Sequence, residues 1–225
     1  MTNAPTSETM REIHRRLREA YGDPPHHPDG DPLAALVNTI LSQNTNDRNR
    51  DIAFARLRTQ FPTWEAVRDA PPEAIIEAIR PAGLAPSKGP HIQAALRQIT
   101  AERGTLSLDF LATLPLEEAR QWLLRLNGVG PKTAAIVLLF ALGRPTFPVD
   151  THIHRVTRRL GLIPEHTSRE KAHGLLEMLV PPELYWSLHL NLIAHGRQVC
   201  HARNPECAGC VLQDMCAYYR AQNVR

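Results

Sequence analysis

Residues 126–150 read LNGVGPKTAAIVLLFALGRPTFPVD, and this stretch decides how the rest of the chain is interpreted. It opens with a Gly-Val-Gly hairpin at residues 128–130, and Pro131 then suits the first turn of a helix because its missing N–H is not needed there. Lys132 lies inside that first turn, and Asp150 follows eighteen residues later. Two glycines that turn before a helix leave N–H groups unpaired, and such groups bind anions, usually phosphate. The stretch therefore predicts a phosphate-binding hairpin; a helix–turn–helix corner with no ligand is the alternative.

Composition is that of an ordinary globular protein. The chain has 225 residues, 43% of them hydrophobic, which is enough to bury the core of one domain or two. Its longest unbroken apolar run, residues 134–143, is ten residues long and too short to span a bilayer. The first twenty residues lack the apolar segment of a signal peptide. We therefore expect a soluble cytoplasmic protein with no membrane partner.

The basic residues carry more information than the net charge. A net charge of +3 with a pI near 8.8 fits nucleic-acid binding without requiring it. Of the 26 basic residues only three are lysines, namely Lys88, Lys132 and Lys171. Arginine does not lose its proton at useful pH and lysine can, so a lysine beside the glycine hairpin indicates an amine nucleophile.

All four cysteines lie within residues 200–216. Disulfides of a secreted chain would be spread along the sequence, so this grouping indicates a metal or cluster site in a reducing compartment. Four thiolates at this spacing would hold either tetrahedral zinc or a [4Fe–4S] cluster, and the spacing alone leaves both open. In either case the expected role is structural. The candidate ligands are Cys200, Cys207, Cys210 and Cys216.

The hydrophobic periodicity is helical nearly throughout, and no run of alternating apolar residues with hairpin turns occurs. Asp31-Pro32 is expected to open a helix, and Ser87 to cap one that reaches about residue 103. The apolar run at residues 134–142 predicts a buried helix that Gly143 ends. We therefore predict an all-α fold whose core is built by helix packing.

Five segments in this order resemble endonuclease III of the helix–hairpin–helix (HhH-GPD) DNA glycosylases, and the resemblance covers nearly the whole chain. It implies a six-helix domain over residues 26–144, a second domain from residues 1–25 plus 145–225 that carries a [4Fe–4S] cluster, and an active-site cleft between the two. It also favours the cluster over zinc. The segments are LSQNTND (41–47), GLAPSK (83–88), LNGVGPKTA (126–134), VDTHIHR (149–155) and HGRQVC (195–200).

The resemblance implies a bifunctional DNA glycosylase and AP lyase that removes oxidised pyrimidines. Its partner would be double-stranded DNA containing a damaged base or an abasic site, bound by a monomer at the nucleoid. The damaged base is flipped out of the duplex, because it cannot be reached in the stack. Lys132 would attack C1′ and expel the base, and the Schiff base would allow β-elimination. Asp150 would stabilise positive charge on the sugar. A phosphate contact is the alternative for Lys132, and a helix cap only for Asp150.

The resemblance also assigns DNA contacts. Leu84 would be an apolar wedge between base steps, with a buried loop anchor as the alternative. Asn44, or else Gln43, would fill the space left by the flipped base; a polar turn at a helix end is the alternative. Further contacts are expected from the hairpin and from arginines that meet phosphate, although scattered arginines are usually a solvated face. These residues are Leu126, Gly128, Val129, Gly130, Arg48, Arg144, Arg197 and Arg203.

The sequence departs from the family in three places. Asn127 stands where the family commonly has proline, the segment between Leu84 and Lys132 is longer than in the bacterial members, and Glu206 lies in a loop that is often basic. Three alternative functions stay open: a mismatch or uracil glycosylase of the same fold, which would lack the hairpin lysine; an ultraviolet-dimer glycosylase, which would keep it; and a non-catalytic DNA-binding module.

Overall fold

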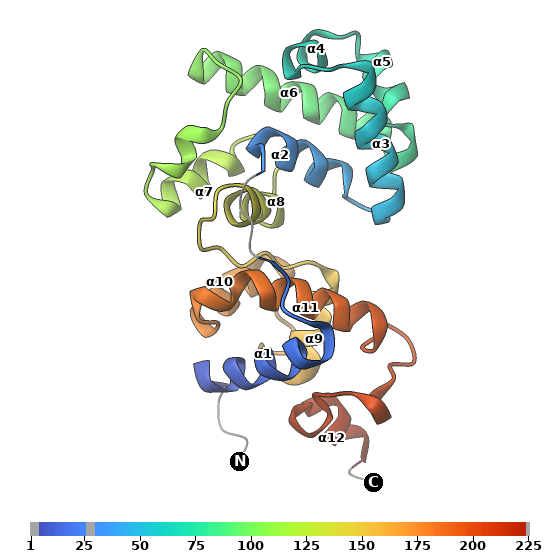
Figure 1. Cartoon of the computed structure of the whole chain (residues 1–225), viewed down its shortest axis with the longest axis vertical. Helices are drawn as coiled ribbons and strands as arrows, with labels where there is room; N and C mark the ends of the chain where they lie inside the picture. The colour runs from blue at the N-terminus through green and yellow to red at the C-terminus, as the bar shows by residue number, and fades with distance from the viewer. Residues whose placement is uncertain (1–4, 26–29, 224–225) are drawn as a thin grey trace. The chain divides into compact units, whose positions relative to one another are not determined.

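The computed structural model describes residues 5–25 and 30–223. All regular secondary structure in these ranges is helical, which confirms the predicted all-α class (Figure 1). No helix of the described chain is both long and apolar enough to cross a membrane. The chain divides into two compact units, Pro28–Arg144 and Met1–His27 with Pro145–Arg225. We call the first the hairpin unit and the second the cysteine unit, and describe each by itself.

The hairpin unit contains seven α-helices in its described residues, one more than the six that the resemblance implies. Helix α4 ends at Asp69, and Pro71 and Pro72 then start α5 as a separate short helix. Two 3₁₀ turns, η1 (Arg80–Ala82) and η2 (Asp109–Ala112), join neighbouring helices. The helices are α2 (Pro32–Leu41), α3 (Asp47–Gln60), α4 (Trp64–Asp69), α5 (Pro72–Ala78), α6 (Ala85–Arg103), α7 (Leu116–Leu124) and α8 (Pro131–Ile136).

One apolar core holds the hairpin unit together. All seven helices contribute buried residues to it, together with Val137 and Leu138, which follow α8. The cap of α2 also contributes, because one oxygen of Asp31 accepts from the N–H of Leu33 and the other from the indole of Trp64, both at 2.8 Å. The helix predicted to open at Asp31-Pro32 is therefore confirmed, and its N-cap residue also links α2 to α4.

Two expectations about helix bounds in this unit are wrong in detail. The helix expected to follow a cap at Ser87 begins three residues earlier, at Ala85, and its N-cap is Leu84 in the left-handed region with φ +50°. The apolar run after α8 is not regular α-helix, because Val137–Ala141 forms a π-helical turn, η3. Gly143, with φ +62°, follows the end of this run as predicted.

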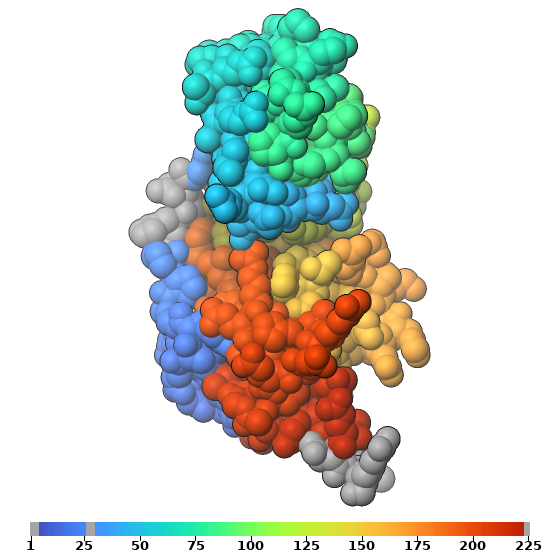
Figure 2. Space-filling view, turned by 90° about the vertical axis from the view of Figure 1, so that its right-hand side faces the viewer, coloured from blue at the N-terminus to red at the C-terminus, as the bar shows by residue number. Residues whose placement is uncertain are grey.

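The cysteine unit packs its helices around α11. Helix α11 contacts both α1 and α9, and Figure 2 shows the surface of α1 beside that of α11. Met10, Ile13 and Leu17 form the buried stripe of α1. Its described residues also form three 3₁₀ turns: η4 (Pro182–Leu184) before α11, and η5 (Cys207–Gly209) and η6 (Gln213–Met215) between α11 and α12. Its helices are α1 (Ser7–Tyr21), α9 (Thr151–Leu160), α10 (Arg169–Leu179), α11 (Tyr185–Gln198) and α12 (Ala217–Asn223).

Candidate active site and cysteine site

The hairpin between α7 and α8 takes its conformation from two glycines. Gly128 has φ +79°, and a Cβ built on it would lie 2.8 Å from the Cβ of His91 on α6, so any other residue would be strained there. Gly130 is the N-cap of α8 with φ −104°, and the space beside it is open. Within the described ranges, the N–H groups of these two glycines donate to no protein acceptor. The hairpin therefore keeps donors available for an anion.

The two apolar residues of the hairpin anchor it in the core. The side chains of Leu126 and Val129 are only 2% and 8% exposed, and the N–H of Val129 donates to the carbonyl of Leu126 at 3.1 Å. A DNA contact at these two positions would therefore involve the backbone and not the side chain.

The polar turn after α2 is tied to the hairpin. The side-chain amide of Gln43 donates to the carbonyl of Gly128 at 3.1 Å. Asn44, the next residue, is exposed and has φ +52°. Because the amide of Gln43 is engaged by the hairpin, Asn44 is the better placed of the two to meet a DNA base.

Leu84 is the exposed apolar residue that a wedge requires. Its side chain is 57% exposed, so the alternative of a buried loop anchor is wrong. Its left-handed backbone is uncommon for a non-glycine residue and is held by the structure around it. Insertion into DNA stays a prediction.

The candidate catalytic residues lie at two helix starts. Lys132 is half-buried in the first turn of α8, next to Pro131. Asp150 is the N-cap of α9, and one oxygen of its carboxylate accepts from the N–H of Ile153 at 2.7 Å. In the described chain, its other oxygen accepts no hydrogen bond. The cap is thus present, and it leaves half of the carboxylate for a second role.

The four candidate arginines differ in what engages them. The guanidinium of Arg144 donates to the carbonyls of Leu111, Ala112 and Leu114 at 2.7–2.8 Å, so it secures the η2 loop and is a poor candidate for phosphate. Arg48, Arg197 and Arg203 are exposed. Contacts of these arginines with DNA stay predictions.

The four cysteines line one cavity of the cysteine unit. The cavity contains about 340 Å³ of space not filled by protein, part of it open to solvent, and Val156, Leu160 and Val199 form its apolar wall. Burial raises the pKa of the thiols of Cys207 and Cys210, so thiolates at these positions need a compensating positive charge. An all-thiolate donor set around one cavity fits an iron–sulfur cluster, whose iron supplies that charge.

Three N–H groups point at the sulfurs. Backbone Leu212 donates to Cys210 at 3.4 Å, and Arg159 donates to Cys200 at 3.3 Å. The third donor is the Nε2 of His195, 3.6 Å from the sulfur of Cys210. Burial lowers the pKa of His195 to about 4, so the imidazole is neutral at neutral pH and carries one N–H. Such bonds stabilise thiolates and tune a cluster that they hold.

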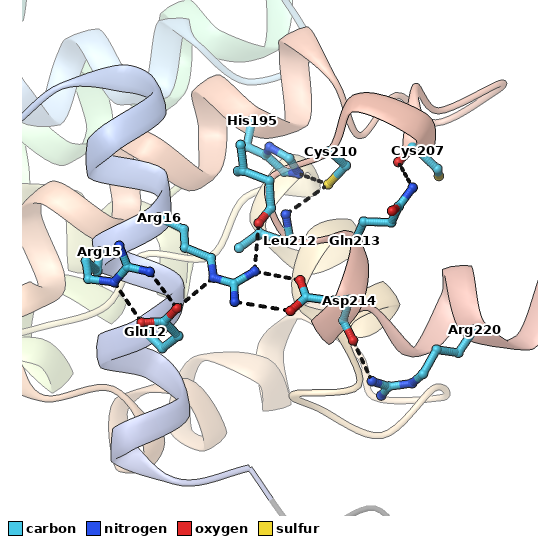
Figure 3. A network of polar contacts seen from close by, with 11 residues as sticks. Glu12, Arg15, Arg16, His195, Cys207, Cys210, Leu212, Gln213, Asp214 and Arg220 are labelled. Carbon is cyan, nitrogen blue, oxygen red and sulfur yellow. Dashed lines mark hydrogen bonds and ion pairs between the residues drawn. The ribbon is translucent and has the colours of Figure 1, made fainter.

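Helix α1 is hydrogen-bonded to this site. The hydroxyl of Tyr21 lies 2.9 Å from Nδ1 of His195, and it donates to Nδ1 when the imidazole proton is on Nε2. Arg16 donates to both carboxylate oxygens of Asp214, at 2.5 and 3.1 Å, and to the carbonyl of Val211 at 3.1 Å (Figure 3). The N-terminal helix thus holds the loop that carries three of the four cysteines.

Glu12 completes the network on α1. Its carboxylate accepts from Arg16 at 2.7 Å and from Arg15 at 2.7 and 2.8 Å. These hydrogen bonds, that of Arg15 first, lower the pKa of Glu12 to about 2, so Glu12 stays ionised and orients Arg16 toward the loop (Figure 3).

Sequence reasoning did not assign the residues that surround the predicted ones. His91, Arg16, Tyr21 and Arg159 carry no local signal, because each acts on a segment that is distant in the sequence. His195 stands within the quoted segment HGRQVC, but its role as a donor to sulfur depends on the fold.

The geometry agrees with comparisons to known proteins. Residues 37–182 match the model of the HhH-GPD superfamily base excision DNA repair protein, and residues 200–216 match the iron-sulfur binding domain of endonuclease III. Endonuclease III of Thermotoga maritima is 34% identical over 95% of this chain and 92% of its own length. A putative DNA glycosylase of Arabidopsis thaliana is 41% identical over 73% of this chain, which spans 56% of that plant protein.

Comparison with solved structures also finds similarity to endonuclease III. A trapped endonuclease III–DNA covalent intermediate matches with a TM-score of 0.82 and 27% identity, covering 96% of this chain and 98% of that one. A non-covalent endonuclease III–DNA complex matches with a TM-score of 0.81, also at 27% identity.

The chain belongs to the HhH-GPD superfamily of base excision DNA repair proteins. Within it the chain is of the endonuclease III type, a DNA-binding glycosylase with AP lyase activity. The match over residues 200–216, which contain all four cysteines, supports a [4Fe–4S] cluster and not zinc in this chain, and the four cysteines as its ligands stay a prediction.

Proposed function

We propose that this enzyme removes oxidised pyrimidines from duplex DNA and nicks the strand 3′ to the abasic site through a Schiff base on Lys132. The observation that carries the proposal is the lysine in the first turn of α8, directly after a hairpin with unpaired N–H groups. The hairpin would hold the DNA backbone by its phosphates while the amine faces the sugar. The protein would act as a monomer on the nucleoid.

The chemistry follows from the properties of an amine. With the damaged base flipped out, neutral Nζ of Lys132 attacks C1′, and the C1′–N bond to the base breaks. The bond between C1′ and the ring oxygen then breaks, which leaves an iminium between C1′ and Nζ. The iminium makes the proton on C2′ more acidic. Removal of that proton breaks the C3′–O bond, and the 3′ phosphate leaves. Water then hydrolyses the iminium and returns the lysine.

Asp150 would assist at two points. The oxygen that caps α9 holds the carboxylate in place, and the other oxygen would accept the ammonium proton and stabilise positive charge on the sugar. In this proposal a single residue serves as helix cap and as proton partner.

The remaining predicted contacts support base flipping. Leu84 would enter the stack as the wedge, Asn44 would occupy the place of the extruded base, and Arg48 would contact phosphate. Arg203 and Arg197 would do the same from the cysteine unit. Exposure of all five side chains is what supports these roles.

The test is borohydride trapping on a duplex that contains one abasic site. Wild type should give a covalent protein–DNA adduct, and Lys132→Gln should give none while binding the duplex with similar affinity. Lys171→Gln is the matched control, because Lys171 is an exposed lysine on α10, and it should trap like wild type. Trapping by Lys132→Gln would overturn the mechanism.

The outcomes also separate the alternatives. A wild type that excises bases without forming an adduct would be a monofunctional mismatch glycosylase, and one that binds without excision would be a docking module. Excision assays on duplexes with an oxidised pyrimidine, a uracil mismatch or a pyrimidine dimer would then assign the substrate. Preference for the dimer would contradict the proposed specificity and leave the lysine chemistry intact.

A further inference from the structure

A buried lysine in the hairpin unit has no place in the chemistry above. The side chain of Lys88 on α6 is among the most buried polar groups of the described chain, with the whole residue 2% exposed. Its ammonium donates to the carbonyl of Leu41 at 2.7 Å and to that of Ala82 at 2.8 Å. In the described residues it forms no ion pair with a carboxylate, and burial lowers its pKa. A buried amine without a counter-ion is costly, so its two contacts require an explanation.

The two acceptors are the ends of helical segments. Leu41 is the last residue of α2, and Ala82 is the last residue of η1. Carbonyls at a helix C-terminus lack intrahelical partners and carry the negative end of the helix dipole, so a cation stabilises them. Lys88 therefore caps two segments at once.

The chain continues from each of these two ends directly into a loop that is proposed to contact DNA. The chain after Leu41 runs through Gln43 to Asn44, which has φ +52°. The chain after Ala82 runs through Gly83 to Leu84, which has φ +50° and an exposed side chain. Non-glycine residues in this region persist only when the surrounding structure fixes them.

We propose that Lys88 is a positioning residue that fixes the wedge loop and the plug loop, residues 83–84 and 43–44, relative to each other, so that both enter a lesion together. The inference rests on the proposed roles of Leu84 and Asn44. The backbone adds to the link, because the N–H of Lys88 donates to the carbonyl of Leu84 at 3.0 Å. The main chain of Lys88 thus bonds the wedge residue, and its side chain bonds Leu41 and Ala82, which precede the plug loop and the wedge loop.

The test compares lesion preference in Lys88→Met, which keeps the length of the side chain and removes its donors. The measured quantity is the ratio of affinities for a duplex with a tetrahydrofuran abasic analogue and for the undamaged duplex. We expect that ratio to fall about tenfold, while affinity for undamaged DNA stays within about twofold. A 2-aminopurine beside the analogue should also lose the fluorescence gain that unstacking by Leu84 produces. Lys171→Met is the matched control and should leave both readouts unchanged.

A double-mutant cycle with Leu84→Ala separates positioning from general stability. If Lys88 acts through the wedge loop, Lys88→Met should reduce lesion preference much less in the Leu84→Ala background than in wild type. Additive losses, or full preference in Lys88→Met, would overturn the inference. A wild type with no preference for the analogue would instead overturn the proposed function.

If Lys88→Met does not fold, the wild-type protein still decides the question. Because the chain has only three lysines, selective ¹⁵N labelling gives few Nζ signals, and Lys132→Gln and Lys171→Arg assign that of Lys88. The Lys88 signal should shift with the abasic duplex and stay in place with undamaged DNA. A Lys88 Nζ signal that shifts with neither the abasic nor the undamaged duplex would contradict the inference.

Discussion

The glycine hairpin and the cysteine loop are both short ligand-binding segments, yet they are held in different ways. The hairpin owes its shape to its own residues, because the left-handed φ of Gly128 and the proline after Gly130 specify the turn and the helix start. The cysteine loop at residues 200–216 contains little regular structure, and residues from α1, α9 and α11 hold it by hydrogen bonds. A local segment is therefore sensitive to its own substitutions, whereas a segment held from a distance is sensitive to its partners and its metal.

Among the four changes that test this comparison, removal of a candidate cluster ligand should have the largest effect. In Cys207→Ser we expect the broad visible absorbance of the cluster to disappear and the melting temperature to fall by more than about 10 °C, since metal binding contributes directly to folding. The hairpin unit has its own core and should keep its helical signal at temperatures where the cysteine unit has unfolded. Visible absorbance and circular dichroism during heating measure both. Retention of full absorbance and stability would mean that Cys207 is not a ligand.

Substitution of the hairpin glycine should have the next largest effect. Gly128→Ala places a Cβ 2.8 Å from His91 at a positive φ and should destabilise the protein by about 1–3 kcal/mol. Gly130→Ala is the matched control, because open space surrounds it and its φ is negative, so its free energy of unfolding should change little. Urea titrations of both variants measure the difference. Equal losses would show that the turn does not depend on Gly128.

Removal of the hydrogen bonds from α1 to the cysteine loop should have a smaller effect. Arg16→Met removes the hydrogen bonds to Asp214 and Val211, and the cluster should be lost to a chelator about tenfold faster. Arg11→Met on the same helix removes only an exposed ion pair with Glu183 and serves as the control. Decay of the visible absorbance measures the rate. If the two variants lose the cluster equally fast, α1 does not secure the loop.

The smallest expected effect concerns charge on the cysteine loop. Glu206 is exposed where the family is often basic, and Glu206→Lys should bind duplex DNA about three- to tenfold more tightly, with a salt dependence steeper by about one phosphate contact. Glu165→Lys makes the same charge change in the exposed loop after α9 and should act much less. Titrations at several salt concentrations would show it, and identical slopes for the two variants would remove this loop from the DNA interface.

Much of the fold was readable from the sequence, and the exceptions share one cause. The all-α class and the helix that opens at Asp31-Pro32 followed from periodicity and the residues at the helix start, and both are confirmed. The start of α6 was misplaced because Leu84 adopts a left-handed conformation that its residue type does not favour. The π-helical turn at Val137–Ala141 carries no sequence signal that we can identify.

In the candidate site, too, the sequence predicted some residues and only the structure showed the contacts of others. Catalytic roles for Lys132 and Asp150 stay predictions, and the structure adds that half of the Asp150 carboxylate caps α9. The choice between Asn44 and Gln43 needed the contact from Gln43 to the hairpin, a pairing across 85 positions. Arg144, chosen from sequence as a phosphate contact, is engaged by three carbonyls that no local pattern indicates.

The sequence by itself determined the helical class, the hairpin, the iron–sulfur cluster and the family, because the residues that indicate each of them lie close together along the chain. Only the tertiary structure decided that Lys88 caps two segments, that Tyr21 is hydrogen-bonded to His195 and that Arg16 holds the cysteine loop. Those contacts join residues that are brought together by burial of the helical cores. Packing of whole helices, and not any local spacing, sets their geometry.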